Sequence, residues 1–326
     1  MLAEIGQNIE KCKSILLSEG LVAIPTETVY GLAANGLNQT AVAKIFEAKN
    51  RPFFDPLILH IGKLSQLDGI VTYIPENAKK IMHHFWPGPI TIVLNKSNSV
   101  PDIVTAGHST VAIRMPNHPI TLKLLAELDF PLAAPSANPF GYVSPTSPQH
   151  VFDQLGLKIP YILNGGNCNI GIESTIISFE NETTPKILRL GVITKQDLQS
   201  IIGNVEVEIN QNSNPTAPGQ LDQHYSPFCK LNAIEDLIFE SSAVPNVLFF
   251  SPQSAELFWS THKQIQHHPF YLSKNHDLIE AASNLFSILR DFDVQHMSEV
   301  YVEMAPNEGI GLAINDRLTR AMAKRH

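Results

Sequence analysis

Two cations and a histidine stand within twelve positions of one another in the sequence, between residues 49 and 60. Lys49 and Arg51 stand at the end of a stretch with helical spacing, residues 40–50, and His60 lies in the apolar run 56–61 that follows. Arginine offers a planar pair of donors and lysine a compact charge, a combination that suits a polyphosphate. The alternative is a cationic helix end that favours the helix dipole and keeps both charges in water. A histidine in an apolar strand is, taken alone, more often a core residue than a ligand.

Small polar groups and one more arginine follow several other predicted strands. They are "PTET" at 25–28, Arg114 at the end of "TVAIR", "SAN" at 136–138 and "ESTI" at 173–176. Each also fits turn or capping chemistry, and Arg114 could pair with an acidic side chain such as Glu27 instead of a substrate carboxylate. Open α/β sheets bind ligands at such strand ends. Because neither a Ser-His-Asp arrangement nor an acid pair is evident, we expect a site that holds an anionic, multi-part ligand without a protein nucleophile.

The sequence contains neither the G-x-x-x-x-G-K-[ST] loop nor the G-x-G-x-x-G turn. A nucleotide site in this chain is therefore expected to use neither a P-loop nor a dinucleotide fingerprint.

The elements that must position these groups are strands and helices in irregular alternation. The first twenty residues predict an amphipathic helix with Ile5, Ile9, Cys12, Ile15 and Leu16 on one face. Helices are also expected at 40–50, 76–86 and 117–128, and strands at 21–24, 56–61, 90–96, 109–116, 130–138, 161–166, 174–179 and 186–191. This mixture predicts an α/β fold with an open, twisted mixed sheet and helices packed on it.

The composition changes near residue 202. Residues 203–228 are rich in Asn, Gln, Pro and Gly and predict a linker or lid. After it, strands at 246–250 and 299–306 alternate with helices at 276–293 and 309–325, as in a small Rossmann-like α/β domain with a parallel sheet. We therefore expect a catalytic domain at 1–202, the linker, and a second domain at 229–326.

Composition and charge limit the classes of function. The chain has 326 residues, 44 % hydrophobic residues and a formal net charge of −8. An acidic balance argues against a broad nucleic-acid surface, although one basic pocket remains compatible with it. Three scattered cysteines favour a reducing compartment, and neither a signal peptide nor a membrane-spanning apolar run is evident, so we expect a cytoplasmic location.

Six motifs occur in order over residues 20–180: "PTETVYGL", "KNRP…PLILHI", "WPGPITIVL", "STVAIRMP", "APSAN…GYVSPT" and "GIESTI". Together they closely resemble the YrdC-type L-threonylcarbamoyladenylate synthases. "APGQLDQHYSP" and "GLAINDRLTRAM" resemble the long, two-domain form. The resemblance implies a YrdC-like sheet with a deep positive cavity and a nucleotidyltransferase reaction. L-threonine, bicarbonate or CO₂, and ATP would give threonylcarbamoyl-AMP, pyrophosphate and water. The product serves the t6A modification of tRNAs that read ANN codons.

The resemblance also implies roles for individual residues. Lys49 and Arg51 would bind the ATP phosphates and support catalysis. Threonine would be bound by Thr28, His60, Arg114, Ala134 and Ser174. The remaining ATP contacts would be Asp55, Thr110, Ser136, Asn138, Ser144, Arg189, His224 and Tyr225. His224 and Tyr225 lie on the linker, which folds over the cavity in the two-domain form. Mg²⁺ would arrive with ATP, and no protein metal ligand is expected.

Asp55 departs from the family pattern, which usually has Asn there. Its charge would either face Mg²⁺ or be neutralised by Arg51. Expected partners beyond the substrates are the downstream t6A transferase complex and a weak RNA contact, with no membrane. Two rival functions remain: a double-stranded RNA-binding module without turnover, and a carbamoyltransferase of the hydrogenase-maturation type, whose cysteine pairs this chain lacks.

Overall fold

The computed structural model describes residues 2–209, 215, 217–219, 221, 224–237, 244–262 and 265–323. The chain forms two compact units. The first comprises Met1–Phe140, Ser144–Asn169 and Glu173–Leu221, and the second comprises Gly141–Val143, Ile170–Ile172 and Asp222–His326. The segment 203–228 is therefore divided between the two units, whereas the sequence predicted one separate linker.

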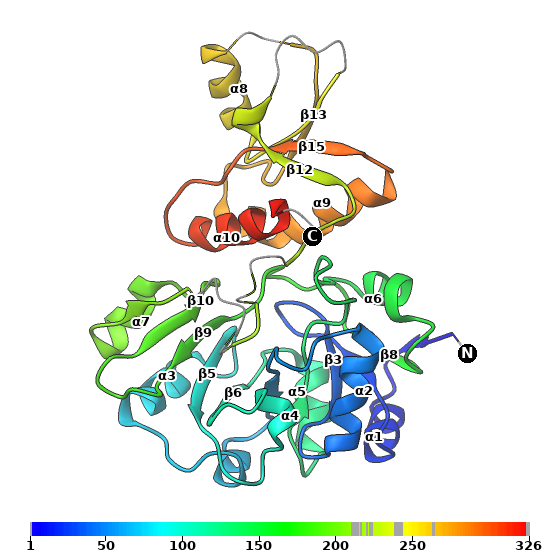
Figure 1. The fold of residues 1–326 in the computed structure, drawn as a ribbon, viewed down its shortest axis with the longest axis vertical. Helices are drawn as coiled ribbons and strands as arrows, with labels where there is room; N and C mark the ends of the chain where they lie inside the picture. Colours follow the sequence, from blue (N-terminus) through cyan, green and yellow to red (C-terminus); the bar gives the residue numbers. More distant parts are fainter. Residues whose placement is uncertain are drawn as a thin grey trace. The chain divides into compact units, whose positions relative to one another are not determined.

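The first unit is built on a mixed sheet (Figure 1). The strand order is β1-β8-β2-β3-β7-β4-β6-β5-β9-β10-β11. β4 pairs in parallel with β6, and β5 with β9, whereas β5–β6, β4–β7 and β9–β10 are antiparallel. The predicted mixed sheet is thus confirmed. The strands are β1 Glu4–Gly6, β2 Val22–Ile24, β3 Gly31–Asn35, β4 Ile58–His60, β5 Ile90–Asn95, β6 Thr110–Arg114, β7 Leu132–Ala133, β8 Tyr161–Leu163, β9 Thr175–Ser178, β10 Lys186–Arg189 and β11 Glu206–Val207.

The central strands of this sheet have two different faces. Leu59, Ile92 and Ile113 belong to the main hydrophobic core of the unit. Ile58, Val93, Ala112, Ile176 and Leu188 form a second, smaller cluster. Because successive side chains of a strand point to opposite faces, this second cluster marks the other face, which we call the site face.

The helices of the first unit begin and end at recognisable caps. α2, which carries Lys49 as its last residue, begins after Asn38, whose side chain accepts a hydrogen bond from Ala41 N. It ends at Asn50 in the left-handed conformation, with φ of 52°. In Figure 1, α2 runs beside β3. The helices are α1 Ile9–Leu17, α2 Gln39–Lys49, α3 Glu76–Phe85, α4 Asp102–Thr105, α5 Pro119–Ala126, α6 Pro148–Leu155 and α7 Lys195–Ile202, with a 3₁₀ turn at Leu64–Gly69.

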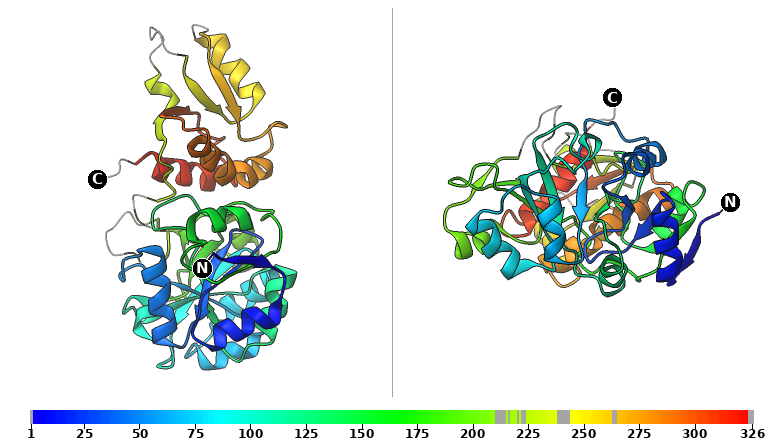
Figure 2. Two further views of the ribbon diagram at one scale, coloured as in Figure 1. Left: turned by 90° about the vertical axis from the view of Figure 1, so that its right-hand side faces the viewer. Right: turned by 90° about the horizontal axis from the view of Figure 1, so that it is seen from below.

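Two sequence predictions are wrong at the edges of the sheet. Residues 4–6 form β1 beside β8 and not the start of a helix, so Ile5 pairs with Ile162 (Figure 2). The helix begins only after Asn8, whose side chain accepts from Lys11 N. Residues 206–207 form β11 against β10, inside the predicted linker. Both strands have two or three residues, too few for an alternating pattern to show.

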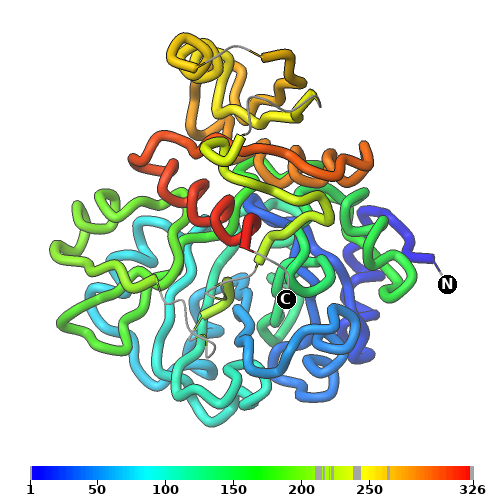
Figure 3. The backbone as a smooth tube through the Cα atoms, turned by 45° about the horizontal axis from the view of Figure 1, so that its top comes forward, coloured from blue at the N-terminus to red at the C-terminus, as the bar shows by residue number. Residues whose placement is uncertain are grey.

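The second unit has a parallel sheet, as the sequence predicted, and its strand order is β12-β15-β13-β14. Figure 3 traces the backbone of its helices and strands from yellow to red. Phe249 packs near Phe258 and Trp259 of α8, whereas Phe270 meets Phe292 of α9, so α8 and α9 cover opposite faces. The elements are β12 Lys230–Ala233, a 3₁₀ turn at Ile234–Asp236, β13 Asn246–Phe249, α8 Pro252–Thr261, β14 His268–Tyr271, α9 Leu278–Val294, β15 Glu299–Val302 and α10 Gly311–Met322. Among the described residues, no helix is long and apolar enough to cross a membrane.

Candidate active site

Lys49 is almost completely buried, with 1 % of its surface exposed. Its Nζ donates hydrogen bonds to the carbonyl oxygens of Ser136 and Asn138. Burial lowers the pKa of Lys49 well below its usual range, and the charge of Arg51 lowers it further, while Asp55 opposes the shift. An anionic ligand would therefore stabilise the charged form of this buried lysine, which the neutral carbonyl groups alone do not neutralise.

Arg51 and Asp55 form a buried ion pair, with 2.9 Å between Nη2 and Oδ2. Arg51 also donates to the carbonyl oxygens of Asp55 and Pro56. Burial raises the pKa of the Asp55 carboxyl, and the positive charges of Arg51, Lys49 and Arg189 oppose that shift. Of the two sequence alternatives for Asp55, the structure has neutralisation by Arg51.

Arg114 joins two residues of the "PTET" loop. Its Nη1 donates to Thr28 Oγ1 at 2.8 Å, and its Nη2 lies 2.8 Å from Glu27 Oε1 in an ion pair. Thr28 Oγ1 is also 2.8 Å from Thr26 Oγ1. The pairing of Arg114 with Glu27 was one of the two possibilities in the sequence, and it does not exclude a ligand carboxylate, because a guanidinium has five donors.

His60 lies beside Arg114, because β4 and β6 pair His60 with Arg114 in register. It is 3 % exposed, and its Nδ1 is 3.2 Å from the carbonyl oxygen of Ile58. Burial and then the charge of Arg114 lower the pKa of His60 to about 3. The imidazole is therefore neutral at physiological pH, which makes it a polar contact and a poor general base.

Ser174 is the centre of a buried hydroxyl network. Its Oγ is 2.8 Å from Thr91 Oγ1 and accepts a hydrogen bond from Arg189 Nη2 at 3.0 Å. Arg189 also donates to the carbonyl oxygen of Pro218 at 3.1 Å. The arginine thus joins the end of the sheet to the segment that follows β11.

Ser144 donates a hydrogen bond to Glu173 Oε1 at 2.6 Å, and both side chains are buried. Ala134 is buried, and its backbone N donates to the carbonyl oxygen of Ile58 at 3.0 Å.

Alternation along the strands places several of these side chains on the site face. On β4, His60 is two residues from Ile58, and on β5, Thr91 is two residues from Val93. On β6, Arg114 and Thr110 are each two residues from Ala112. Ala217 packs on the same apolar cluster. Thr110, Val93 and Leu188 also line a small cavity of about 180 Å³ with Ser178 and Lys186 among its walls. The site face is therefore an apolar floor with cations and hydroxyl groups at its margin.

His224 and Tyr225 belong to the second unit. Tyr225 is fully buried there, 5.2 Å from Phe286 in a stacked arrangement, with the Arg317 guanidinium 5.6 Å from its ring. The structure thus gives Tyr225 a packing role in the second unit, and its predicted nucleotide contact stays a prediction.

Thr91 of this network was missed in the sequence. Thr91 interrupts the apolar strand β5, and a buried hydroxyl on a strand that is otherwise apolar is a signal that could have been used. Glu173 belongs to the polar patch "ESTI" of the sequence analysis, but the hydrogen bond that it accepts from Ser144 is a long-range contact that the local pattern does not indicate.

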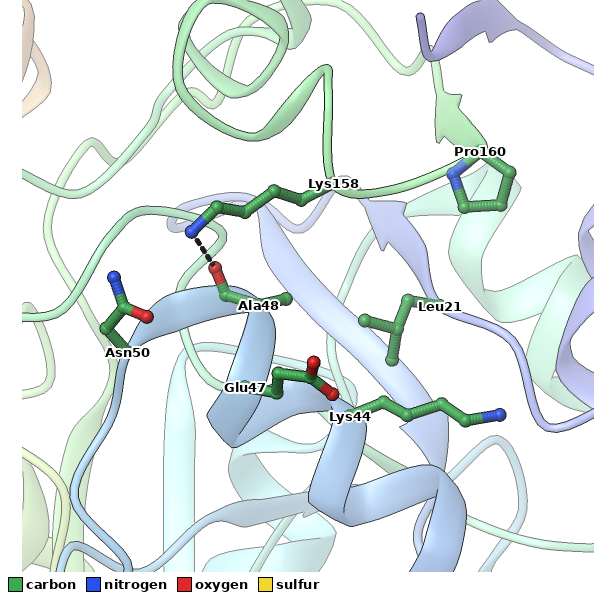
Figure 4. Close-up of a pocket in the computed structure, with 7 residues that line it drawn as sticks. All are labelled: Leu21, Lys44, Glu47, Ala48, Asn50, Lys158 and Pro160. Atoms are coloured by element: carbon green, nitrogen blue, oxygen red, sulfur yellow. Dashed lines mark hydrogen bonds between the residues drawn. The ribbon is translucent and has the colours of Figure 1, made fainter. Parts of the chain in front are cut away.

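A larger cavity of about 640 Å³ lies elsewhere on the first unit (Figure 4). Its walls are Leu21, Lys44, Glu47, Ala48, Asn50, Lys158 and Pro160, none of them a predicted site residue. Lys158 Nζ donates to the carbonyl oxygen of Ala48 at 2.8 Å, at the C-terminal end of α2. This bond supports the helix end that carries Lys49.

Asp55 is the carboxylate among these cations, and carboxylates are the ligand type that Mg²⁺ takes. Its Oδ2 is ion-paired with Arg51, whereas its Oδ1 has no partner among the described residues, so the pairing with Arg51 competes with a metal that ATP brings. Over the part of the chain that the structure describes, no group of three or more His, Cys, Asp or Glu side chains could hold a metal ion by itself.

Comparisons with known proteins match the whole chain. Residues 14–191 match the model for the Sua5–YciO–YrdC family, described as "Telomere recombination", and residues 193–323 match "Threonylcarbamoyl-AMP synthase, C-terminal domain". Threonylcarbamoyl-AMP synthases of Bacillus subtilis and Pyrococcus abyssi are 38 % and 39 % identical, over 97 % and 100 % of this chain and 93 % and 98 % of theirs. The crystal structure of Pyrococcus abyssi Sua5 with L-threonine has a TM-score of 0.85 and 34 % identity, and covers 99 % of this chain and 97 % of that one.

Proposed function

The chain belongs to the Sua5–YciO–YrdC family, and from this premise we propose that it is a threonylcarbamoyl-AMP synthase. It joins L-threonine, bicarbonate or CO₂, and ATP, and releases pyrophosphate as a nucleotidyltransferase does. The product then supplies the threonylcarbamoyl group for t6A in tRNA through a downstream transferase complex in the cytoplasm.

One observation carries this proposal: four buried cations of the first unit form two groups. Lys49, Arg51 and Arg189 surround Asp55, and Arg114 stands beside His60 and Thr28. Buried cations are expensive unless a counter-charge is near. The first group carries more positive than negative charge and suits a triphosphate, while the second suits the carboxylate of an amino acid.

The amino-acid half of the site would hold threonine by its two charged ends. The Arg114 guanidinium would bind the carboxylate, with its Nη1 shared between the ligand and Thr28. Neutral His60 and Ser174 would contact the remaining polar atoms of threonine. Glu27 Oε1 is ion-paired with Arg114, whereas its buried Oε2 has no partner among the described residues, so Oε2 suits the ammonium group.

The reaction needs alignment and charge neutralisation more than a protein nucleophile. The threonine ammonium first loses a proton to solvent, and the free amine attacks CO₂ and loses a second proton to give a carbamate. A carbamate oxygen then attacks the α-phosphorus of ATP, the bond from this phosphorus to the bridging oxygen breaks, and pyrophosphate leaves. Holding the reactants in place contributes on the order of 7–11 kcal/mol to the lowering of the barrier. Lys49 and Arg51 would stabilise the negative charge that develops on the leaving pyrophosphate. Mg²⁺ that arrives with ATP would be held by the phosphates and would add to that neutralisation.

The segment after β11 would exclude water from the reaction. Ala217 packs on the apolar floor of the site face, and the Pro218 carbonyl oxygen accepts a hydrogen bond from Arg189. Carbamates and acyl adenylates hydrolyse in water, so a covering segment protects them.

The test is mass spectrometry of the products after incubation with ATP, Mg²⁺, L-threonine and bicarbonate. Threonylcarbamoyl-AMP and pyrophosphate are expected, and Lys49→Ala or Arg51→Ala should abolish both. Pyrophosphate release that needs carbamoyl phosphate would indicate the carbamoyltransferase function instead. Binding of double-stranded RNA without any turnover would indicate the binding module, and either result would overturn the proposal.

A further inference from the structure

Two short segments from the first half of the chain belong to the second unit. They are Gly141–Val143 and Ile170–Ile172. The first lies between Asn138 and Ser144, and the second ends directly before Glu173. Each segment therefore interrupts a loop that carries predicted site residues, and the covalent chain ties those residues to the second unit.

Helix α9 holds the first segment through two side chains. Tyr142 Oη donates a hydrogen bond to Asp293 Oδ2 at 2.5 Å. Arg290 donates to the carbonyl oxygen of Val143, and its guanidinium carbon lies 5.1 Å from the centroid of the Tyr142 ring. Asp293 also accepts from the backbone N of Phe228 at 3.0 Å and from that of Cys229 at 2.8 Å. The segment is thus fixed by charge-assisted hydrogen bonds among residues that are themselves mostly buried.

The same helix holds the second segment by close backbone packing. Gly171 has a φ of +80°, and a Cβ at this position would lie 2.5 Å from both Cα and O of Ser283 and 2.6 Å from the carbonyl oxygen of Ala282. Both the conformation and the distance require glycine. Since a backbone contact of this kind has no flexible side chain to absorb a change, the position of α9 directly sets the position of this segment.

The residues that directly follow the two segments contact each other. Val143 is followed by Ser144, and Ile172 is followed by Glu173. The Ser144 hydroxyl donates to Glu173 Oε1 at 2.6 Å. The next residue, Ser174, accepts the hydrogen bond from Arg189. The contact of α9 with Val143 is therefore one residue from Ser144, and its contact with Gly171 is two residues from Glu173. Ser144 and Glu173 share this hydrogen bond inside the predicted site.

We propose that Arg290 and Asp293 are positioning residues for the ATP and threonine site, acting through Tyr142–Ser144 and Gly171–Glu173. This inference rests on the proposed function, because it gives the second unit a part in the reaction. α9 would hold the two loops at the separation that the substrates require. A displacement of about 1 Å at a site of this kind can lower the rate about a hundredfold.

The test compares single variants of the full-length protein. Tyr142→Phe removes only one hydroxyl group, Arg290→Met removes the charge and the bond to Val143, and Arg290→Lys keeps the charge. Val294→Ala is the matched control, because Val294 is on the same helix but is 74 % exposed. Affinities for ATP and for L-threonine are measured by calorimetry, and kcat by pyrophosphate release, normalised to the fraction of active protein.

Tyr142→Phe and Arg290→Met are expected to weaken ligand binding about fivefold and to lower kcat about tenfold or more. Arg290→Lys should be intermediate and Val294→Ala within twofold of the wild type. A merely structural role would reduce the active fraction and leave the affinities and kcat of the folded protein unchanged, and that result would overturn the inference. If Arg290→Met does not fold, Tyr142→Phe decides. If the wild type binds ATP without forming product, the proposed function fails, and the ATP affinities of the variants still decide the inference.

Discussion

Replacing Asp55 by Asn isolates the charge that opposes ATP binding. Asp55 lies among Lys49, Arg51 and Arg189, so the group carries three positive charges and one negative charge. The substitution changes the net charge of this group from +2 to +3, while the amide oxygen of Asn can still accept a hydrogen bond from Arg51. We therefore expect Asp55→Asn to bind ATP more tightly than the wild type.

The size of the effect follows from the distance between the charges. Two unit charges about 7 Å apart, a spacing typical of a phosphate beyond a paired arginine, interact by about 2.4 kcal/mol at an effective dielectric constant of about 20. Screening by salt and Mg²⁺ reduces this to about 1–2 kcal/mol, or a dissociation constant about 5- to 30-fold lower. The same change leaves a buried guanidinium without its counter-charge and should lower the free energy of unfolding by about 1–3 kcal/mol.

The assay is calorimetric titration of ATP into the wild type and the variant, with urea unfolding in parallel. Asp102→Asn is the matched control, since Asp102 also pairs with a lysine, Lys96, but its side chain is 84 % exposed. Exposed pairs contribute about 0–1 kcal/mol, so this control should change neither measurement by much. Weaker ATP binding by Asp55→Asn would refute the reasoning, because it would mean that Asp55 serves as a metal ligand more than as a counter-ion to Arg51.

Three further predictions concern the other buried groups. Arg114→Lys should raise the dissociation constant for threonine about 10- to 100-fold, because an ammonium cannot replace a two-pronged guanidinium; the ATP affinity should stay within twofold, and equal losses for both ligands would contradict the assignment. ATP binding at alkaline pH should take up protons, because burial and the charge of Arg51 lower the pKa of Lys49 and the triphosphate raises it again; calorimetry in two buffers over a series of alkaline pH values measures the uptake, and equal uptake by Lys49→Arg would contradict this contact. Burial lowers the pKa of His60 to about 3 in the folded protein, while the unfolded chain takes up the proton below about pH 6.5, so the free energy of unfolding falls as the pH falls. In urea unfolding between pH 7.5 and 5, the wild type should lose about 2 kcal/mol more of this free energy than His60→Asn, and equal losses would show that His60 is accessible to protons.

The sequence predicted the parts of the site that depend on local patterns. Lys49 ends, and Arg51 follows, a helix that the spacing of its apolar residues predicts. Arg114 and His60 end apolar strands, so the strand pattern predicted that these two residues lie at one edge of the sheet. For Asp55 the sequence left two alternatives, a Mg²⁺ ion or Arg51 as its partner. The partner depends on the turn between residues 51 and 55, whose conformation the hydrophobic pattern does not determine.

Long-range pairings could not be predicted in the same way. The bond between Ser144 and Glu173 joins residues 29 positions apart, and it depends on two loops that come together only in the folded chain. β1 and β11 are held by neighbouring strands and have no pattern of their own. The sequence also gave no indication that Gly141–Val143 and Ile170–Ile172 belong to the second unit, since each has only three residues.

The in-register pairing of β4 with β6 also limits how this protein can change over time. His60 and Arg114 are side by side only while both strands keep their alignment. A single-residue insertion in either strand would rotate its cation or imidazole into the apolar core and expose core side chains in its place. Changes in substrate preference should therefore arise by replacing side chains at fixed positions, while insertions and deletions accumulate in the connections between the strands.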